Sequence, residues 1–338
     1  MIAASDLAKS PLLTVAGVVG DPRDLSAAIR KHRPDVITLD LKMPHMSGCE
    51  VLERVLCDYT IPTLIISAVT MEEGPEVMRA LELGAVDYME KPTFETLKSG
   101  AAGLIDRVLQ AASTKVRRGQ KRTLSPRRAT SPKRSGTYQY RKPLILVGAS
   151  TGGVQAITEI LTQLPPSIPP ILIVQHIPAL FSLAFATRLN QICPFNVREA
   201  QHGEAVQHDQ VLIAPGNKHM TIEADGLGGL KVALSDQPPV NRHRPSVDVL
   251  FESAIKIGLG PQVIGVILTG MGNDGAAGLK LLKQHGAQTI AQDEASCAVF
   301  GMPREAIRLG AADTVCSLET IAKQIERLLA AKDGASAA

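Results

Sequence analysis

Residues 144–153 have the sequence LILVGASTGG, and apolar residues with helical spacing follow from Val154 to Leu161. The four apolar residues at 144–147 predict a buried strand, and the residues from Val154 onward predict a helix. A serine between glycines at such a turn fits the nucleophile-elbow pattern, in which small neighbours allow a sharp bend that pushes Ser150 Oγ outward. The same pattern also fits a plain tight turn that packs a helix on its strand. A catalytic interpretation therefore requires a base and an orienting acid elsewhere in the chain.

Two further apolar runs end in residues that supply these groups. Residues 171–174 (ILIV) run into His176, and residues 263–268 (VIGVIL) run into a glycine-rich loop that contains Asp274. In an open, doubly wound parallel sheet, residues just past the carboxyl ends of strands gather along one edge. Taken singly, a histidine there is usually structural and an aspartate usually forms a turn. The coincidence of three such positions favours a catalytic triad of Ser150, His176 and Asp274, although the chain order is not that of the α/β-hydrolases.

The glycine-rich loop also supports a different interpretation. Residues 270–275 (GMGNDG) form a G-x-G-x-x-G that follows a predicted strand and precedes a helix expected at 276–285, and Asp293 lies eighteen residues beyond the last glycine. This is close to the dinucleotide-binding fingerprint. In that role Asp274 would lie beside a pyrophosphate, which repels a carboxylate. This repulsion weighs against a nucleotide-binding enzyme, which stays one alternative. A non-catalytic signalling adaptor, in which the glycine turns are only scaffold, is another.

Long segments then match a known family in one order along the chain. They are GASTGG at 148–153, QH at 175–176, APGNKHM at 214–220, PVNRHRPSVD at 239–248, ILTGMGNDGA at 267–276, EASC at 294–297 and GMPREA at 301–306. On these segments the run from Leu144 to about Leu329 resembles the catalytic domain of the chemotaxis response-regulator protein-glutamate methylesterases, the CheB family. The resemblance implies a doubly wound parallel-sheet α/β domain with Ser150, His176 and Asp274 as its triad.

The implied reaction is hydrolysis of glutamate γ-methyl esters on chemoreceptors with release of methanol, together with deamidation of particular receptor glutamines. The backbone N–H of Met271, helped by that of Thr151, is the implied oxyanion donor. No cofactor is expected for catalysis, because the histidines lack zinc-site spacing and the chain has no C-x-x-C. In the segment from Asn241 to Asp248, the residues Arg242, His243 and Arg244 either line the site and meet an acidic receptor surface or pair internally as an ordinary loop.

A basic segment separates this region from the front of the chain. Residues 113–142 hold eleven Lys and Arg and no Asp or Glu, among Ser, Pro and Thr. Such a composition cannot bury a core and predicts a disordered linker. The formal net charge of the whole chain is +3, so without the +11 of this segment the remaining residues have a net charge of about −8. We expect a receiver-like domain at 1–112, a catalytic domain at 143–332 and a tail at 333–338.

The front domain alternates strand-like and helix-like segments and resembles a response-regulator receiver, a flavodoxin-like α/β fold. Three strand-like runs lead to Asp40, Ser67 and Lys91. By this resemblance Asp40 accepts a phosphoryl group from a chemotaxis histidine kinase, Mg²⁺ assists, and Ser67 and Lys91 contact the phosphoryl group. Unphosphorylated, such a receiver is expected to block the catalytic edge, and phosphorylation to release it.

The beginning of the chain departs from the receiver pattern. A receiver starts with a buried strand that ends in an acidic pair, whereas residues 1–7 read MIAASDL, and the segment from Leu12 to Val19 matches the region after the first helix. The missing strand would be central in the 2-1-3-4-5 order. We therefore expect either a start further upstream or a destabilised receiver whose metal site is incomplete and holds only Asp40.

Composition argues against disulfide-rich, secreted and membrane-spanning classes of protein. The five cysteines are odd in number and scattered, which argues against a disulfide framework. No run of eighteen apolar residues and no signal peptide is evident. We expect a cytoplasmic enzyme that binds chemoreceptors and a histidine kinase, without nucleic acid and without membrane insertion.

Overall fold

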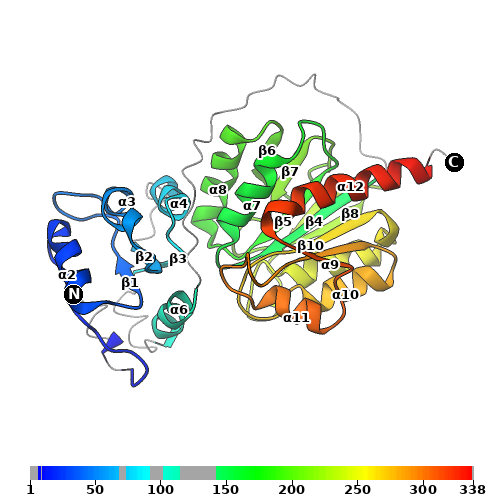
Figure 1. Cartoon of the computed structure of the whole chain (residues 1–338). Coiled ribbons are helices and arrows are strands. Elements are labelled where there is room, and N and C mark those ends of the chain that lie inside the picture. Colours follow the sequence, from blue (N-terminus) through cyan, green and yellow to red (C-terminus); the bar gives the residue numbers. More distant parts are fainter. Residues whose placement is uncertain (1–6, 9, 68–73, 92–101, 115–141, 337–338) are drawn as a thin grey trace. The chain divides into compact units, whose positions relative to one another are not determined.

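The computed structural model describes residues 7–8, 10–67, 74–91, 102–114 and 142–336. The chain divides into two compact units, Met1–Arg122 and Thr123–Ala338. Most of the predicted linker, residues 115–141, lies outside the described residues, and its disorder stays a prediction. Figure 1 shows the elements of both units.

The carboxy-terminal unit is built on a sheet of seven parallel strands in the order β12-β11-β10-β4-β5-β7-β6. The strands are β4 (Leu144–Ala149), β5 (Ile171–Gln175), β6 (Asn196–Glu199), β7 (Gln210–Ile213), β10 (Val263–Ile267), β11 (Gln288–Gln292) and β12 (Thr314–Cys316). β4 and β5 are buried at every position, as the apolar runs predict for strands covered on both faces. The doubly wound parallel sheet expected for this region is therefore confirmed.

Helices cover both faces of this sheet (Figure 1). They are α7 (Gly153–Gln163), α8 (Ala179–Ile192), α9 (Val247–Lys256), α10 (Ala276–Gln284), α11 (Met302–Arg308) and α12 (Leu318–Ser336), with the short helix η3 (Gly260–Gln262). On one face α9, α10 and α11 share a continuous apolar core with Leu144 and Leu146 of β4. On the other, α7 packs against α8 and α12. Helix α12 continues to Ser336, into the residues predicted as a tail.

A separate antiparallel hairpin completes this unit. Strands β8 (His219–Ala224) and β9 (Leu230–Ser235) pair with His219 opposite Ser235. Their inward side chains Met220 and Val232 join the core that contains α9. The hairpin therefore fixes the segment that runs from β9 to the first turn of α9.

The order of the strands decides where a site can form. The chain adds β5, β7 and β6 on one side of β4 and then returns to add β10, β11 and β12 on the other side. β4 is therefore flanked by β5 and β10, at the point where the winding reverses. Ligand and catalytic sites of open α/β sheets lie at such switch points, outside the carboxyl ends of the strands.

The amino-terminal unit contains a smaller parallel sheet in the order β1-β2-β3. Its elements are η1 (Pro22–Asp24), α2 (Leu25–His32), β1 (Ile37–Leu39), α3 (Gly48–Arg54), η2 (Leu56–Asp58), β2 (Thr63–Ser67), α4 (Gly74–Glu82), β3 (Asp87–Glu90) and α6 (Ala102–Ala112). Leu64 and Ile66 of β2 pack against Leu104 and Val108 of α6. The α/β class expected for this domain is confirmed.

In the described part of this unit, no strand precedes β1, and the segment from Leu12 to Val19 forms none. Residues 1–6 lie outside the described residues. The absence of a first receiver strand therefore stays a prediction. No helix among the described residues is both long enough and apolar enough to span a bilayer.

Candidate active site

The turn after β4 presents Ser150 at the carboxyl end of the central strand. Gly152 has φ +78° and precedes α7, a left-handed conformation that glycine adopts at little cost. A Cβ on Gly153 would lie 2.0 Å from Gln175 Oε1. The amide nitrogen of that same glutamine donates to the carbonyls of Ser150 (2.8 Å) and His176 (3.3 Å). The close approach allowed by Gly153 therefore lets one side chain tie the predicted nucleophile to the predicted base.

His176 follows β5 directly and lies next to Ser150. Ala149 pairs with Gln175 in the β4–β5 register, and His176 N–H donates to Ala149 O at 3.0 Å. On the far side of β4, Gly270 packs so closely on Ser150 that a Cβ would lie 2.7 Å from Ser150 Cβ. Loop residues after β10 and β5 therefore border the serine on both sides.

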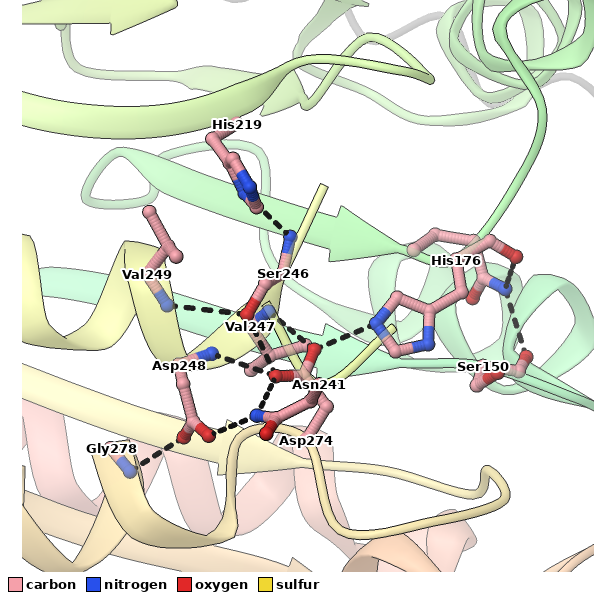
Figure 2. Close-up of polar contacts among 11 residues, drawn as sticks. Ser150, His176, His219, Asn241, Ser246, Val247, Asp248, Val249, Asp274 and Gly278 are labelled. Atoms are coloured by element: carbon pink, nitrogen blue, oxygen red, sulfur yellow. Dashed lines mark hydrogen bonds and ion pairs between the residues drawn. The ribbon is translucent and has the colours of Figure 1, made fainter. Parts of the chain in front are cut away.

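Asp274 follows β10 and makes a hydrogen bond with the predicted base. His176 Nε2 donates to Asp274 Oδ2 at 2.8 Å, and the two side chains are 7% and 1% exposed. In Figure 2 the His176 ring lies between Asp274 and Ser150. The structure thus brings the three residues to one edge of the sheet and joins His176 to Asp274; the described contacts include no hydrogen bond between His176 Nδ1 and Ser150.

The Asp274 carboxylate is held by several further donors (Figure 2). Val247 N–H donates to Oδ2 at 2.7 Å, while Ser246 Oγ and Asn241 Nδ2 donate to Oδ1 at 2.7 and 2.9 Å. Burial by itself would raise the pKa of Asp274, but the hydrogen bond and charge of His176, with the donations from Asn241 and Val247, lower it to about 2. The group is therefore a carboxylate at neutral pH, buried but fully provided with donors.

The ring nitrogens of His176 have different surroundings. Because Nε2 donates to Asp274, the neutral ring carries its free lone pair on Nδ1. Nδ1 is buried and has no hydrogen-bond partner among the described residues. A buried polar atom without a partner is uncommon in proteins, and here it lies on the side of the ring toward Ser150 (Figure 2). Nδ1 is therefore the ring atom available to take a proton.

A second histidine supports this network from behind. His219, at the start of β8, is 1% exposed, and its Nδ1 accepts from Ser246 N–H at 3.2 Å. Its Nε2 donates to Pro238 O at 3.0 Å. In the neutral ring, one nitrogen accepts and the other donates, so both have hydrogen-bond partners. The bond to Ser246 N–H holds that residue where its hydroxyl can reach Asp274.

A second carboxylate, Asp248, lies behind the first. It accepts from Gly278 N–H at 2.6 Å and from Asn241 Nδ2 at 2.7 Å. Burial raises the pKa of Asp248 to about 6; the Gly278 hydrogen bond opposes this rise and the nearby Asp274 charge adds to it. Sequence reasoning did not single out Asp248 or Asn241, although both lie in the matched segment at 239–248.

The basic residues of that segment divide between the two predicted alternatives. Arg244 pairs internally, donating to Asn217 Oδ1 at 2.7 Å and to Asp236 O at 2.8 Å. His243 instead lies at the site, with its ring stacked on that of His176. Arg242 is exposed. Arg244 therefore shows the internal pairing expected of an ordinary loop, and His243 lies at the site.

The predicted oxyanion donors differ in their surroundings. Met271 is 46% exposed, and its backbone N–H makes no hydrogen bond within the described part of the chain. Thr151 is 5% exposed, and its carbonyl accepts from Thr269 Oγ1 at 3.0 Å. The backbone N–H of Met271 is thus available to donate to a substrate oxygen. Both oxyanion assignments stay predictions.

In the amino-terminal unit, Asp40, Ser67 and Lys91 lie at the carboxyl ends of β1, β2 and β3. Lys91 Nζ donates to Asp40 Oδ2 at 2.5 Å, and Lys91 N–H donates to Ser67 O at 2.8 Å. The predicted phosphoryl site is therefore assembled at one edge of this sheet. Its residue roles stay predictions.

The described residues do not complete a magnesium site there. Mg²⁺ prefers oxygen ligands and near-octahedral geometry, usually with one or two carboxylates. Asp40 Oδ2 is already bonded to an ammonium group, and the described residues contain no cluster of three or more His, Cys, Asp or Glu that could hold a metal. Residues 1–6 lie outside the described residues, so the incomplete metal site expected from the sequence stays a prediction.

Comparisons with known proteins agree with this architecture. The family described as CheB methylesterase matches residues 145–325, and the response regulator receiver domain matches residues 3–100. A protein-glutamate methylesterase/protein-glutamine glutaminase of Burkholderia lata is 46% identical over 95% of this chain and 90% of its own length. Another from Paraburkholderia xenovorans is 45% identical over 93% and 89%. The crystal structure of the Thermotoga maritima CheB methylesterase catalytic domain superposes with a TM-score of 0.54 and 37% identity, covering 55% of this chain and 98% of that one. On these matches, which span both units, the chain belongs to the CheB family of protein-glutamate methylesterases/protein-glutamine glutaminases with an N-terminal receiver domain.

Proposed function

We propose that this chain hydrolyses glutamate γ-methyl esters on the cytoplasmic domains of chemoreceptors, deamidates specific receptor glutamines, and is controlled by its receiver domain during chemotaxis adaptation. The observation that carries the proposal is the His176–Asp274 pair, whose ring nitrogen Nδ1 is buried without a partner on the side toward Ser150. A nucleotide-binding role for residues 270–275 is not supported. The oxygens of the Asp274 carboxylate accept hydrogen bonds from buried groups of the protein itself and do not face a ligand.

The reaction begins with proton transfer from Ser150 Oγ to His176 Nδ1 as Oγ attacks the ester carbonyl carbon. Asp274 holds the ring in this tautomer and stabilises the imidazolium that forms. The carbonyl oxygen becomes an oxyanion, for which the backbone N–H of Met271 is the proposed donor. Loss of one such donor typically costs about 10²–10³ in turnover.

The tetrahedral intermediate then collapses. The C–O bond to the methoxy group breaks, and His176 returns its proton so that methanol leaves. The glutamyl group remains esterified to Ser150. A water molecule attacks the carbonyl carbon of this acyl-enzyme while His176 takes one of its protons. The C–O bond to Ser150 Oγ then breaks, His176 returns the proton to Oγ, and the glutamic acid that is released loses its proton to solvent. With a glutamine substrate the same steps release ammonia in place of methanol.

Control by the receiver is proposed to act through Asp40 as the phosphoryl acceptor. Its contact with Lys91 supports this assignment, because a cation beside the acceptor offsets the charge of an added phosphoryl group. A difference of about 1–3 kcal/mol between the two states of the receiver is enough for a clear change in rate.

The test is methanol release from a methylated chemoreceptor cytoplasmic domain, comparing the full chain with its Ser150→Ala variant. The matched control is Ser167→Ala, an exposed serine in the loop before β5, at the other edge of the sheet. We expect release by the wild-type chain and by Ser167→Ala, and none above background by Ser150→Ala. Release that survives in Ser150→Ala contradicts the proposed nucleophile.

A further inference from the structure

A tight turn lies beside the catalytic pair and has no part in the reaction steps above. Val240 N–H donates to His243 O at 3.0 Å, and His243 N–H donates to Val240 O at 2.9 Å. The two central residues, Asn241 and Arg242, have φ of +52° and +67°. Left-handed conformations at both central positions define a type I′ turn, a rigid two-residue connection. Asn is one of the residue types that accept this conformation most readily.

The first side chain of this turn connects two buried carboxylates. Asn241 Nδ2 donates to Asp274 Oδ1 at 2.9 Å and to Asp248 Oδ2 at 2.7 Å. An amide nitrogen carries two hydrogens, so both are used, one for each carboxylate (Figure 2). Hydrogen bonds to ionised acceptors are stronger than those between neutral groups. Asn241 therefore anchors the turn to the orienting acid of the triad.

The last side chain of the turn covers the base. The rings of His243 and His176 stack with centroids 3.7 Å apart and an interplanar angle of 9°. The His176 ring has one hydrogen bond, at Nε2, and its Nδ1 has none among the described residues. This hydrogen bond holds Nε2 in place but restrains the tilt of the ring plane only weakly. At this stacking distance the ring cannot turn without displacing His243.

We propose that the Val240–His243 turn is a positioning arm for the catalytic pair. Asn241 anchors the arm on Asp274 and Asp248, and His243 holds the plane of the His176 ring so that Nδ1 stays directed at Ser150. Both are positioning residues, since they act on the base and its partner. The kinetic part of this inference rests on the proposed function, whereas the anchored stack itself does not.

The arm predicts an effect on turnover and not on substrate affinity. His243→Ala removes the stacked ring and is expected to lower kcat about two- to tenfold, the range that corresponds to the energy of an aromatic pair. KM is expected to stay within about twofold. His243→Phe keeps a flat ring without ring nitrogens and is expected to restore kcat to within about twofold of wild type.

The anchor is tested by Asn241→Gly. Glycine accepts the left-handed backbone of this position but removes the amide that reaches both carboxylates. We expect Asn241→Gly to lower kcat as His243→Ala does. The stack is read independently by NMR, as the ring-current shift of the His176 ring protons, with the signal assigned by its loss in His176→Gln. That shift is expected in wild type and His243→Phe and is expected to disappear in His243→Ala and Asn241→Gly.

The experiment uses the full chain, a methylated chemoreceptor cytoplasmic domain, and His285→Ala as the matched control. His285 is an exposed histidine at the end of α10. The proposal is overturned if His243→Phe loses as much kcat as His243→Ala, if His243→Ala changes KM alone, or if the shift persists in Asn241→Gly. If the wild-type chain releases no Ser150-dependent methanol, the proposed function fails. The NMR comparison then still decides whether the anchored stack exists.

Discussion

Replacing Asp274 with asparagine is the most informative single change. Both carboxylate oxygens accept hydrogen bonds, so an NH₂ group at either position would face donors. Oδ2 receives His176 Nε2 at 2.8 Å and Val247 N–H at 2.7 Å, and Oδ1 receives Ser246 Oγ at 2.7 Å and Asn241 Nδ2 at 2.9 Å. The Ser246 hydroxyl can rotate and accept instead. Two backbone groups cannot: Val247 N–H donates to Oδ2, and Asp248 N–H donates to Oδ1 at 3.4 Å, so either placement of the new NH₂ group meets at least one fixed donor.

Two losses follow from Asp274→Asn. At the Oδ2 position, the NH₂ group makes His176 Nε2 an acceptor and moves the ring proton to Nδ1, where the base is needed. We expect methanol release from a methylated chemoreceptor domain to fall about 10⁴-fold, the size associated with the wrong tautomer in serine proteases. The unsatisfied buried donor is expected to lower the free energy of unfolding by about 1–3 kcal/mol, measured by urea titration at pH 7.

The stability loss carries a pH signature. The pKa of Asp274 is lowered from 3.8 to about 2 in the folded chain. The carboxylate therefore contributes roughly 2 kcal/mol that is fully present above pH 4 and is lost as the pH falls toward 2. The stability difference between wild type and Asp274→Asn is expected to narrow as the pH falls below 4.

The matched control is Asp236→Asn, whose carboxylate is 70% exposed and paired with Lys218 at 3.1 Å. Exposed ion pairs contribute little to stability. The free energy of unfolding of the control is therefore expected to stay within about 1 kcal/mol of that of wild type, and the control is expected to keep its activity. A folded Asp274→Asn variant that retains more than about a tenth of wild-type turnover refutes the assignment of Asp274 as the orienting acid.

Three other changes test further features, two in the carboxy-terminal unit and one in the amino-terminal unit. Gly153→Ala puts a Cβ 2.0 Å from Gln175 Oε1, and the resulting shift is expected to lower the free energy of unfolding by about 1–3 kcal/mol in urea titrations and to reduce methanol release; unchanged values contradict the close packing. Burial raises the pKa of Asp248 from 3.8 to about 6, so this group stabilises the fold below pH 4 and the contribution, roughly 3 kcal/mol, is lost as the pH rises through 6. The stability of wild type relative to Asp248→Asn is expected to fall by that amount between pH 4 and 7 in urea titrations, and a flat difference contradicts the shift. Lys91→Ala breaks an ion pair with Asp40 whose side chains are 45% and 32% exposed, so the free energy of unfolding is expected to change by less than about 1 kcal/mol; a larger loss in a urea titration indicates a structural role.

The strands that carry the site could be predicted because their signals are local. The runs at 144–147, 171–174 and 263–268 are apolar and are followed at once by glycine or a polar residue, and each forms a buried strand within one or two residues of the predicted end. Parallel strands share one carboxyl edge, so the meeting of Ser150 and His176 follows from the fold class without knowledge of any side-chain contact.

The residues around Asp274 could not be predicted in the same way. Asn241 and Ser246 reach the carboxylate because α9 packs against α10, and that packing depends on contacts between segments distant in sequence. The turn itself has a weak local signal, since Asn-Arg is not the Asn-Gly pair typical of type I′ turns. His243 therefore reads as a basic loop residue, and only its tertiary position reveals the stack on His176.

The orientation of the His176 ring follows from the order of the strands. In serine proteases Nδ1 faces the aspartate and Nε2 the serine, whereas here Nε2 bonds Asp274. β4 lies between β5 and β10, so Ser150 is one strand from His176 and Asp274 is two strands away. With neighbouring strands about 4.8 Å apart, the ring must extend past the serine to meet the acid. Nδ1 is the ring nitrogen nearer the backbone and Nε2 the farther one, so the near nitrogen faces the near strand and the far nitrogen reaches the far strand. The same triad chemistry therefore uses the opposite ring nitrogen because the serine comes from the strand in the middle.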